Sequence, residues 1–319
     1  MRLALSIRGI LLFLHLALLM PAYAQQQQAP SQFPPLKVEV DLVNSSVTVT
    51  NREGRAVTGL KKEDFTVIED GVPQEIAFFH DDEHIPVSIG ILFDTSGSMV
   101  DKIEGVQDAV VHFANTTNPG DDIFLIRFST NVSLVQDFTN DRVQLLRAIG
   151  ELRPQGSTAL YDAIVEGLDH LRAGKHKKKA LLVVTDGNDT SSSASLQETI
   201  ATAQQSEAVV YALGIGHGER GSFGHLPFEH DDRVNIAALR SIAEPTGGRA
   251  VLLEGPHHRN RVDQIDQAAV QVSAELRNQY SIGYYPKNRA KDGTFRRLQV
   301  KTVNPNYAVR ARSGYLAPR

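Results

Sequence analysis

The sequence of 319 residues contains no cysteine. This absence excludes a small fold held together by disulfide bonds, so packing of an apolar core must stabilise the chain. Hydrophobic residues make up 41% and charged residues 22% of the sequence, fractions that are typical of ordinary globular proteins. The contents of Gly and Pro are close to average, which excludes a low-complexity or collagenous chain.

The sequence also lacks a strong excess of one charge. It has 33 Lys and Arg against 37 Asp and Glu, for a formal net charge of -4. Proteins that bind nucleic acid through their backbone phosphates usually carry a basic surface. We therefore expect no nucleic-acid partner.

Long apolar runs are absent after the first 24 residues, so no later segment can span a bilayer. The first segment is typical of a secretory signal peptide: Arg2 and Arg8 are positive, residues 9–20 are apolar, and Ala22 and Ala24 form a small-x-small cleavage pattern. We expect residues 1–24 to be removed and the protein to be secreted or periplasmic, without stable membrane insertion. An uncleaved N-terminal anchor is the alternative, and no Cys follows that could carry a lipid.

The segment after the signal peptide begins with a Gln- and Pro-rich stretch, residues 25–35, which predicts a disordered linker. Residues 36–85 favour a small β module, because residues 36–42 alternate apolar and polar side chains. Asp70 and Gly71 predict a hairpin turn between strands at 65–68 and 74–79. Pro73 indicates that the second of these strands lies at a sheet edge.

From residue 86 to 279, predicted strands alternate with amphipathic helices, the pattern of a parallel sheet covered on both faces. The expected strands are 87–93, 123–128, 132–138, 180–185, 208–215 and 250–253. The expected helices are 103–113, 142–152, 161–171, 196–205, 236–243 and 262–276. This order predicts a doubly wound α/β domain, Rossmann-like, around a mostly parallel six-stranded sheet.

After residue 280 the pattern returns to strands, expected at 280–285, 294–303 and 307–312. Residues 280–319 carry nine Lys or Arg and one acidic residue, whereas residues 36–86 carry five basic and eleven acidic residues. Short strands with open edges need partners. We predict that the two segments pair into one discontinuous β module; a solvated basic tail is the alternative.

Chemistry-bearing residues follow the first strand of the α/β domain as Asp94, Ser96 and Ser98. In an open α/β sheet, the loops at the carboxyl ends of the strands form the binding crevice. Because Ser96 and Ser98 lie two apart in a tight turn, both hydroxyls can face one point. Read alone, this turn is also compatible with an ordinary helix cap.

Two further loops offer oxygen atoms to the same crevice: Thr158 precedes a predicted helix and Asp186 follows a predicted strand. The five side chains are hard oxygen ligands, which suit an octahedral Mg²⁺ or Mn²⁺ ion and do not suit zinc or copper. Such a set leaves one coordination position open for water or for an acidic ligand oxygen.

These residues resemble the metal-ion-dependent adhesion site of the von Willebrand factor type A domain, in order and in approximate spacing, over residues 86–279. The flanks are similar to the bacterial secreted von Willebrand factor A-related proteins, in the segments at 47–50, 59–65 and 283–286. The resemblance implies that Ser96, Ser98 and Thr158 coordinate Mg²⁺ directly, with Mn²⁺ or Ca²⁺ as alternatives, and that Asp94 and Asp186 act through water. It also implies a protein ligand that presents an Asp or Glu side chain.

Other motifs carry less weight. Residues 216–221 match a dinucleotide-binding fingerprint but do not open a helix, so residues 216–232 are interpreted as an insertion loop. The 11 His residues show no zinc-binding spacing.

The sequence thus favours an exported module without enzymatic activity that binds an acidic protein partner. Two alternatives stay open. One is a Mg²⁺-dependent hydrolase that uses a metal-bound water, although no general base is evident. The other is a structural module in which the metal only rigidifies the crevice.

Overall fold

The computed structural model describes residues 42–83, 85–186, 188–216, 234–253 and 258–319. The predicted signal peptide, the linker and most of the strand at 36–42 lie outside the described residues, as does the loop at 217–233.

The α/β domain contains a six-stranded sheet in the order β10-β9-β8-β5-β6-β7. The pairs along this sheet are parallel, except that β7 runs antiparallel to β6. The strands are β5 (Val87–Asp94), β6 (Asp122–Phe128), β7 (Val132–Thr139), β8 (Lys178–Thr185), β9 (Val209–Ile215) and β10 (Arg249–Leu253). The predicted fold class, a doubly wound and mostly parallel sheet, is confirmed.

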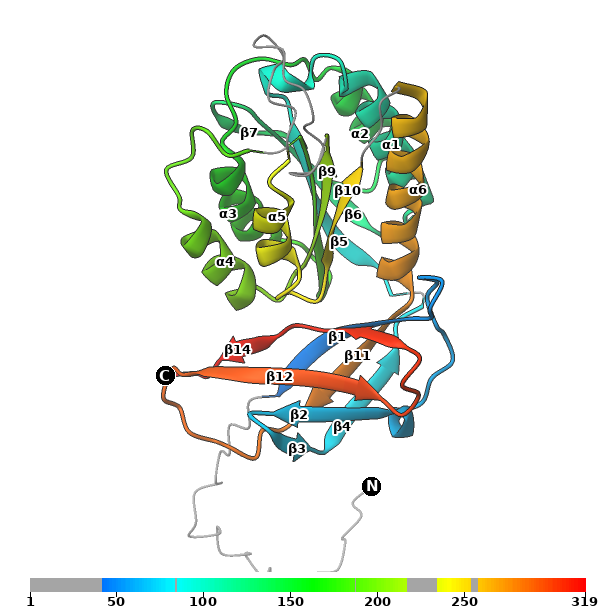
Figure 1. Cartoon of the computed structure of the whole chain (residues 1–319), viewed down its shortest axis with the longest axis vertical. Helices are drawn as coiled ribbons and strands as arrows, with labels where there is room; N and C mark the ends of the chain where they lie inside the picture. Colours follow the sequence, from blue (N-terminus) through cyan, green and yellow to red (C-terminus); the bar gives the residue numbers. More distant parts are fainter. Residues whose placement is uncertain (1–41, 84, 187, 217–233, 254–257) are drawn as a thin grey trace, which may run out of the picture. The chain divides into compact units, whose positions relative to one another are not determined.

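Helices cover both faces of this sheet (Figure 1). They are α1 (Ile103–Thr116), α2 (Arg142–Gly150), α3 (Leu160–Leu171), α4 (Leu196–Gln205), α5 (Ile236–Ala243) and α6 (His258–Arg277). Side chains of α1, α2 and α6 pack on one face and those of α3, α4 and α5 on the other. Because β5 is buried along its whole length, its apolar residues alternate between the two cores, Ile91 facing one and Leu92 the other.

The β module consists of two four-stranded sheets around one shared core. One sheet has the order β13-β1-β11-β4, and the other has the order β14-β12-β2-β3. The strands of the first sheet are β1 (Val43–Thr50), β4 (Ile76–Asp81), β11 (Gln279–Tyr284) and β13 (Ala308–Arg310). Those of the second are β2 (Phe65–Glu69), β3 (Val72–Gln74), β12 (Phe295–Thr302) and β14 (Gly314–Leu316).

N-terminal and C-terminal strands alternate within both sheets of this module. Strand β1 pairs with β11 and β13, and β2 pairs with β12. The core they enclose includes Val47 and Val67 from the early strands and Ile282 and Val300 from the late ones. The predicted β module built from both ends of the chain is confirmed.

The predicted hairpin differs in its second strand. Asp70 and Gly71 adopt positive φ angles of 47° and 82°, as a tight hairpin turn requires. The turn joins β2 to the short edge strand β3, which contains Pro73, whereas β4 belongs to the opposite sheet and pairs with β11. Residues 74–79 are therefore not one strand, because the chain crosses between sheets there.

Pairing between distant strands determines two further features of the β module. The polar residues 44–46 lie within β1, and Asn44, Ser45 and Ser46 all have partners in β11. The expected strand at 307–312 is limited to β13, which pairs with β1, and β14 lies beyond it, pairs with β12 and was not predicted. In β1, pairing with a distant strand overrides the local signal of polar residues.

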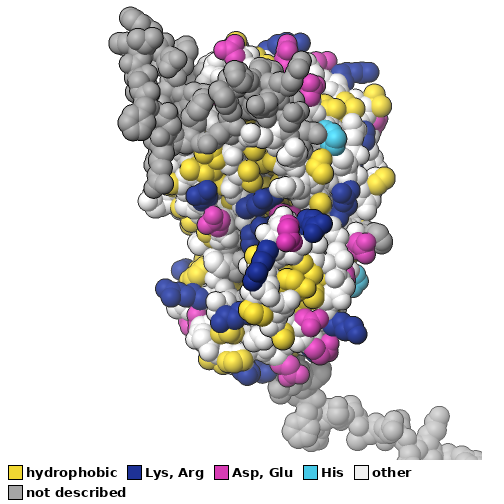
Figure 2. All heavy atoms as spheres, turned by 45° about the vertical axis from the view of Figure 1, so that its right-hand side comes forward, with side chains coloured by type: hydrophobic (Ala, Val, Ile, Leu, Met, Phe, Trp, Pro, Cys, Tyr) yellow, Lys and Arg dark blue, Asp and Glu magenta, His cyan; other side chains and the backbone are white. Residues whose placement is uncertain are grey.

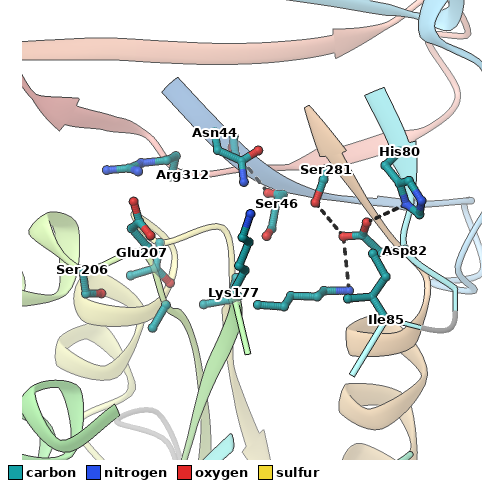
Figure 3. Close-up of a pocket in the computed structure, with 15 residues that line it drawn as sticks. Asn44, Ser46, His80, Asp82, Ile85, Lys177, Ser206, Glu207, Ser281 and Arg312 are labelled. Carbon is teal, nitrogen blue, oxygen red and sulfur yellow. Dashed lines mark hydrogen bonds and ion pairs between the residues drawn. The ribbon is translucent and has the colours of Figure 1, made fainter. Parts of the chain in front are cut away.

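Buried polar contacts join the β module to the α/β domain. The Lys178 ammonium donates to the Leu276 carbonyl at 2.7 Å and lies 3.5 Å from Asp82. Asp82 also accepts from the Ser281 hydroxyl at 2.7 Å. Figure 3 shows Asp82 and Ser281 beside a cavity of about 270 Å³, whose lining residues come from both parts of the chain. The joint lies at the amino ends of β5 and β8.

The surface is of mixed charge. Figure 2 shows the described Lys and Arg side chains interspersed with Asp and Glu side chains on the face drawn. Among the described helices, none combines the length and apolarity needed to cross a membrane.

Gly248 lies just before β10 at a close approach to the neighbouring strand. A Cβ atom there would lie 1.8 Å from the carbonyl oxygen of Val210. We expect Gly248→Ala to lower the free energy of unfolding by about 2 kcal/mol or more, because the backbone must move. Gly150→Ala, at the end of α2 with no atom within 4 Å of its Cβ position, is the control and should be neutral or slightly stabilising. Chemical denaturation measures both, and equal stabilities would contradict the packing described.

Candidate metal-binding site

The sheet brings two of the three predicted segments together directly. Strands β5 and β8 are parallel neighbours, with Phe93 opposite Val184. Asp94 is the last residue of β5, and Asp186 follows the end of β8. Because parallel strands end at the same edge of a sheet, the two carboxylates lie at one place.

Asp94 is held by hydrogen bonds on both carboxylate oxygens. Its Oδ1 accepts from the backbone N–H of Ser96 at 2.8 Å, and its Oδ2 accepts from the Thr185 hydroxyl at 2.6 Å. The side chain is fully buried. The first bond shapes the turn into a short 3₁₀ helix, Gly97–Met99, and the second ties that turn to the end of β8.

The two serine hydroxyls and Asp186 form a continuous chain of contacts. The hydroxyl oxygens of Ser96 and Ser98 are 3.0 Å apart, and the Ser98 hydroxyl donates to Asp186 Oδ1 at 3.0 Å. Ser96 and Asp186 are buried, while Ser98 is exposed. An oxygen cluster therefore lies at the surface of the crevice, and one of its members is accessible to a ligand.

The loop that carries Thr158 adjoins this turn through its backbone. The Gly97 N–H donates to the Gly156 carbonyl at 2.9 Å, and the Gln155 N–H donates to the Thr95 carbonyl at 2.6 Å. Gly156 has a φ of 79°, a conformation that disfavours any residue with a Cβ. The side chain of Thr158 is buried.

The same loop is fixed on its other side by the segment after β8. The Thr158 N–H donates to the Thr190 hydroxyl at 2.9 Å, and the Thr190 N–H donates to the Thr158 carbonyl at 2.8 Å. The structure thus joins Asp94, Ser96, Ser98 and Asp186 through side-chain contacts and places Thr158 in the adjoining loop.

Sequence reasoning missed one charged residue of this cluster. The Lys102 ammonium lies 2.9 Å from Asp186 Oδ2, and both side chains are buried, with 8% and 6% exposed. Lys102 occupies the N-cap position of α1. A positive charge is unfavourable at a helix N-terminus. The place of a lysine there was therefore the one sign in the sequence that its side chain interacts with a group outside the helix.

Burial and charge repulsion perturb Asp94. Its pKa is raised from 3.8 to about 6, first because burial disfavours the charged form and second because Asp186 adds a nearby negative charge. The hydrogen bonds from Thr185 and Ser96 oppose this rise. The cluster is therefore a place where additional positive charge would be stabilising.

The donor set fits a hard divalent cation. Hydroxyl and carboxylate oxygens lie within hydrogen-bonding distance of one another, and these are the ligands that Mg²⁺ takes in proteins. Within the described part of the chain, no group of three or more His, Cys, Asp or Glu side chains could hold a metal. A metal would thus have to use a mixed set of hydroxyls and carboxylates.

The dinucleotide-like fingerprint and several of the His residues lie largely outside the described part of the chain. Gly216 directly follows β9, but the remainder of the fingerprint, from residue 217, lies outside the described residues, so the insertion-loop interpretation stays a prediction. Of the His residues, His80 contacts Asp82 near the joint with the β module, at the amino ends of the strands.

The family model of the von Willebrand factor type A domain matches residues 88–254. Among curated proteins, human integrin alpha-D is 28% identical over 200 residues, which cover 55% of this chain and 17% of that protein. The chain thus corresponds to a small part of the length of this relative.

Two of the solved structures that are similar to this chain come from bacteria. A von Willebrand factor type A protein from Catenulispora acidiphila is 13% identical, with 88% of this chain and 74% of that chain covered and a TM-score of 0.47. An aerotolerance-related membrane protein from Bacteroides fragilis is 19% identical, with 60% and 98% covered and a TM-score of 0.47.

The raised pKa of Asp94 predicts a stabilising substitution in the metal-free protein. Ionisation of this buried carboxyl costs stability in chelator, so Asp94→Asn should raise the free energy of unfolding at pH 7.5 by about 1–3 kcal/mol. The free energy of unfolding of the wild type should fall by this amount as the pH rises from about 4 through 6, while that of the variant should not. Thermal melts across this pH range measure the effect, and parallel pH profiles would contradict it.

Proposed function

The chain belongs to the von Willebrand factor type A domain family, and on this basis we propose that it is an exported module that binds an acidic side chain of a partner protein through Mg²⁺. Domains of this family generally mediate protein–protein interaction or adhesion and are typically not enzymes. The finer proposal concerns the metal, its ligands and the chemistry of the partner.

In this proposal Ser96, Ser98 and Thr158 hold the metal directly, and Asp94 and Asp186 hold it through water. The bound ion supplies a Lewis-acidic position that accepts one carboxylate oxygen of the partner. The chain's own residues fix the geometry. The hydrogen bonds on Asp94 orient its carboxylate, and the backbone contacts of Gly156 keep the Thr158 loop beside the turn.

A single observation carries the proposal: the Ser98 hydroxyl lies 3.0 Å from both the Ser96 hydroxyl and an Asp186 oxygen. Residues 88 positions apart in the chain thus meet at an exposed point of the crevice. A helix cap would explain the turn at residues 94–98 but gives no reason for contact with Asp186. The raised pKa of Asp94 is further support, because it indicates that a cation would be stabilised at this place.

The preference for an acidic partner follows from charge. Two carboxylates cancel the charge of a divalent ion only formally, and at a partly dry surface the ion still attracts an anionic oxygen. Export is proposed from the apolar run and the small-x-small pattern at the start of the sequence. Such a module would act outside the cytoplasm.

Metal binding is tested by thermal melts of the wild type and Ser98→Ala in Mg²⁺, Mn²⁺, Ca²⁺ or chelator. A cation that binds only the native state at 100 times its Kd adds about 2.7 kcal/mol, a rise of several degrees in Tm. We expect this rise in the wild type and little of it in Ser98→Ala. Ser241→Ala, which removes a hydroxyl that bonds only within α5, is the control and should respond like the wild type. A wild type that responds to none of the three cations would refute the site.

Partner chemistry is tested by selecting peptides from a random library on the immobilised protein in Mg²⁺. Selected peptides should contain an Asp or Glu whose change to Asn or Gln abolishes binding, because an amide carries no charge for the ion to attract. Binding should also be lost in chelator. Peptides that lack an acidic residue and bind equally in chelator would show that the metal is not the point of capture.

A further inference from the structure

The proposed metal-binding site contains a positively charged side chain of the protein itself. Lys102 reaches Asp186 from the start of α1, and the pair is almost fully shielded from water. The two oxygens of Asp186 are divided between partners, since Oδ1 accepts from the Ser98 hydroxyl and Oδ2 faces the Lys102 ammonium. The lysine therefore fixes which oxygen of Asp186 is turned toward the serine cluster.

The charges of the cluster do not balance. Asp94 and Asp186 are the two acids of the proposed site, and Lys102 forms an ion pair with Asp186. With both carboxylates ionised, the three side chains sum to one negative charge. A divalent cation would then leave one positive charge in excess, whereas the same site without the lysine would be neutral.

Burial strengthens the electrostatic effect of the Lys102 charge. Lys102 and Asp186 are less than a tenth exposed and Asp94 is fully buried, so water screens their interactions poorly. An ammonium this close to the ligands repels an incoming cation and attracts an incoming anion. The carboxylate of a partner would bring the loaded site to neutrality.

We propose that Lys102 is a positioning residue that sets the charge of the site, weakening metal binding and strengthening capture of an anionic ligand. The inference rests on the proposed function, because it concerns the same metal and the same class of ligand. A purely structural lysine would affect both binding steps in the same direction, whereas this role moves them in opposite directions.

The test compares the wild type with Lys102→Met, which keeps the length of the side chain and removes the charge, and with Lys102→Arg, which keeps the charge. Calorimetric titration with Mn²⁺ measures metal binding. Titration of the Mn²⁺-loaded proteins with glutarate, and with uncharged glutaramide for comparison, measures anion capture. Lys178→Met is the matched control, since Lys178 is equally buried and lies at the opposite end of β8.

We expect Lys102→Met to bind Mn²⁺ at least about tenfold more tightly than the wild type and glutarate at least about threefold more weakly. Its Tm in chelator should fall, because Asp186 loses its counter-ion, and its Mn²⁺-induced rise in Tm should be larger. Lys102→Arg should resemble the wild type in both titrations. Lys178→Met should lower Tm without changing either affinity.

Unchanged or weaker Mn²⁺ binding in Lys102→Met, or a parallel loss of metal and glutarate, would overturn the proposal while leaving the site intact. Absence of Mn²⁺ binding in the wild type would instead overturn the proposed function together with this inference. Should Lys102→Met not fold, Lys102→Gln replaces it, since its amide can still donate to Asp186, and the same opposite shifts are required.

Discussion

The parallel pairing of β5 with β8 is the constraint on which the candidate site depends. The register that sets Phe93 opposite Val184 brings the next residues, Asp94 and Thr185, within hydrogen-bonding distance. The following turn can then direct the Ser98 hydroxyl to Asp186. A slip of one residue would turn every side chain of β5 to the other face of the sheet, so burial of both faces keeps the two carboxylates together.

The two ends of β8 show how the same kinds of charge serve different purposes. At its start, Lys178 is compensated by Asp82 and by the Leu276 carbonyl, and the group joins the β module to the α/β domain. Beyond its end, Asp186 is compensated by Lys102, while no described Lys or Arg side chain forms an ion pair with Asp94. The charges at the start of β8 are therefore compensated within the structure, whereas the site beyond its end would be stabilised by an added positive charge.

Much of the architecture could be predicted from local patterns. The continuous apolar run of β5 and its alternation with amphipathic helices indicated a buried parallel sheet, and opposite charges at the two flanks suggested that they pair. The partners of short strands could not be predicted, because periodicity reports a strand but not its sheet. For this reason β4 was assigned to the hairpin at Asp70, and the strand predicted at 307–312 was too long for β13 and omitted β14.

The five predicted site residues could be chosen because each follows or precedes a recognisable element. Contacts across the sheet edge join four of them and bring the loop of Thr158 beside the turn, and these contacts are visible only in the structure. Lys102 could not be found in the same way, since a long flexible side chain has no fixed direction in the sequence. Only its unfavourable place at a helix N-terminus set it apart.

The α/β domain is inserted between two neighbouring strands of the β module, because β4 leads into β5 and α6 leads into β11, and β4 and β11 pair with each other. Both covalent connections therefore leave the domain at the end opposite to the serine cluster. A pull exerted by a captured partner would be shared between two tethers anchored in one ladder of hydrogen bonds. Such a layout resists mechanical load better than a single flexible linker, because neither connection can lengthen unless the strands of the β module separate.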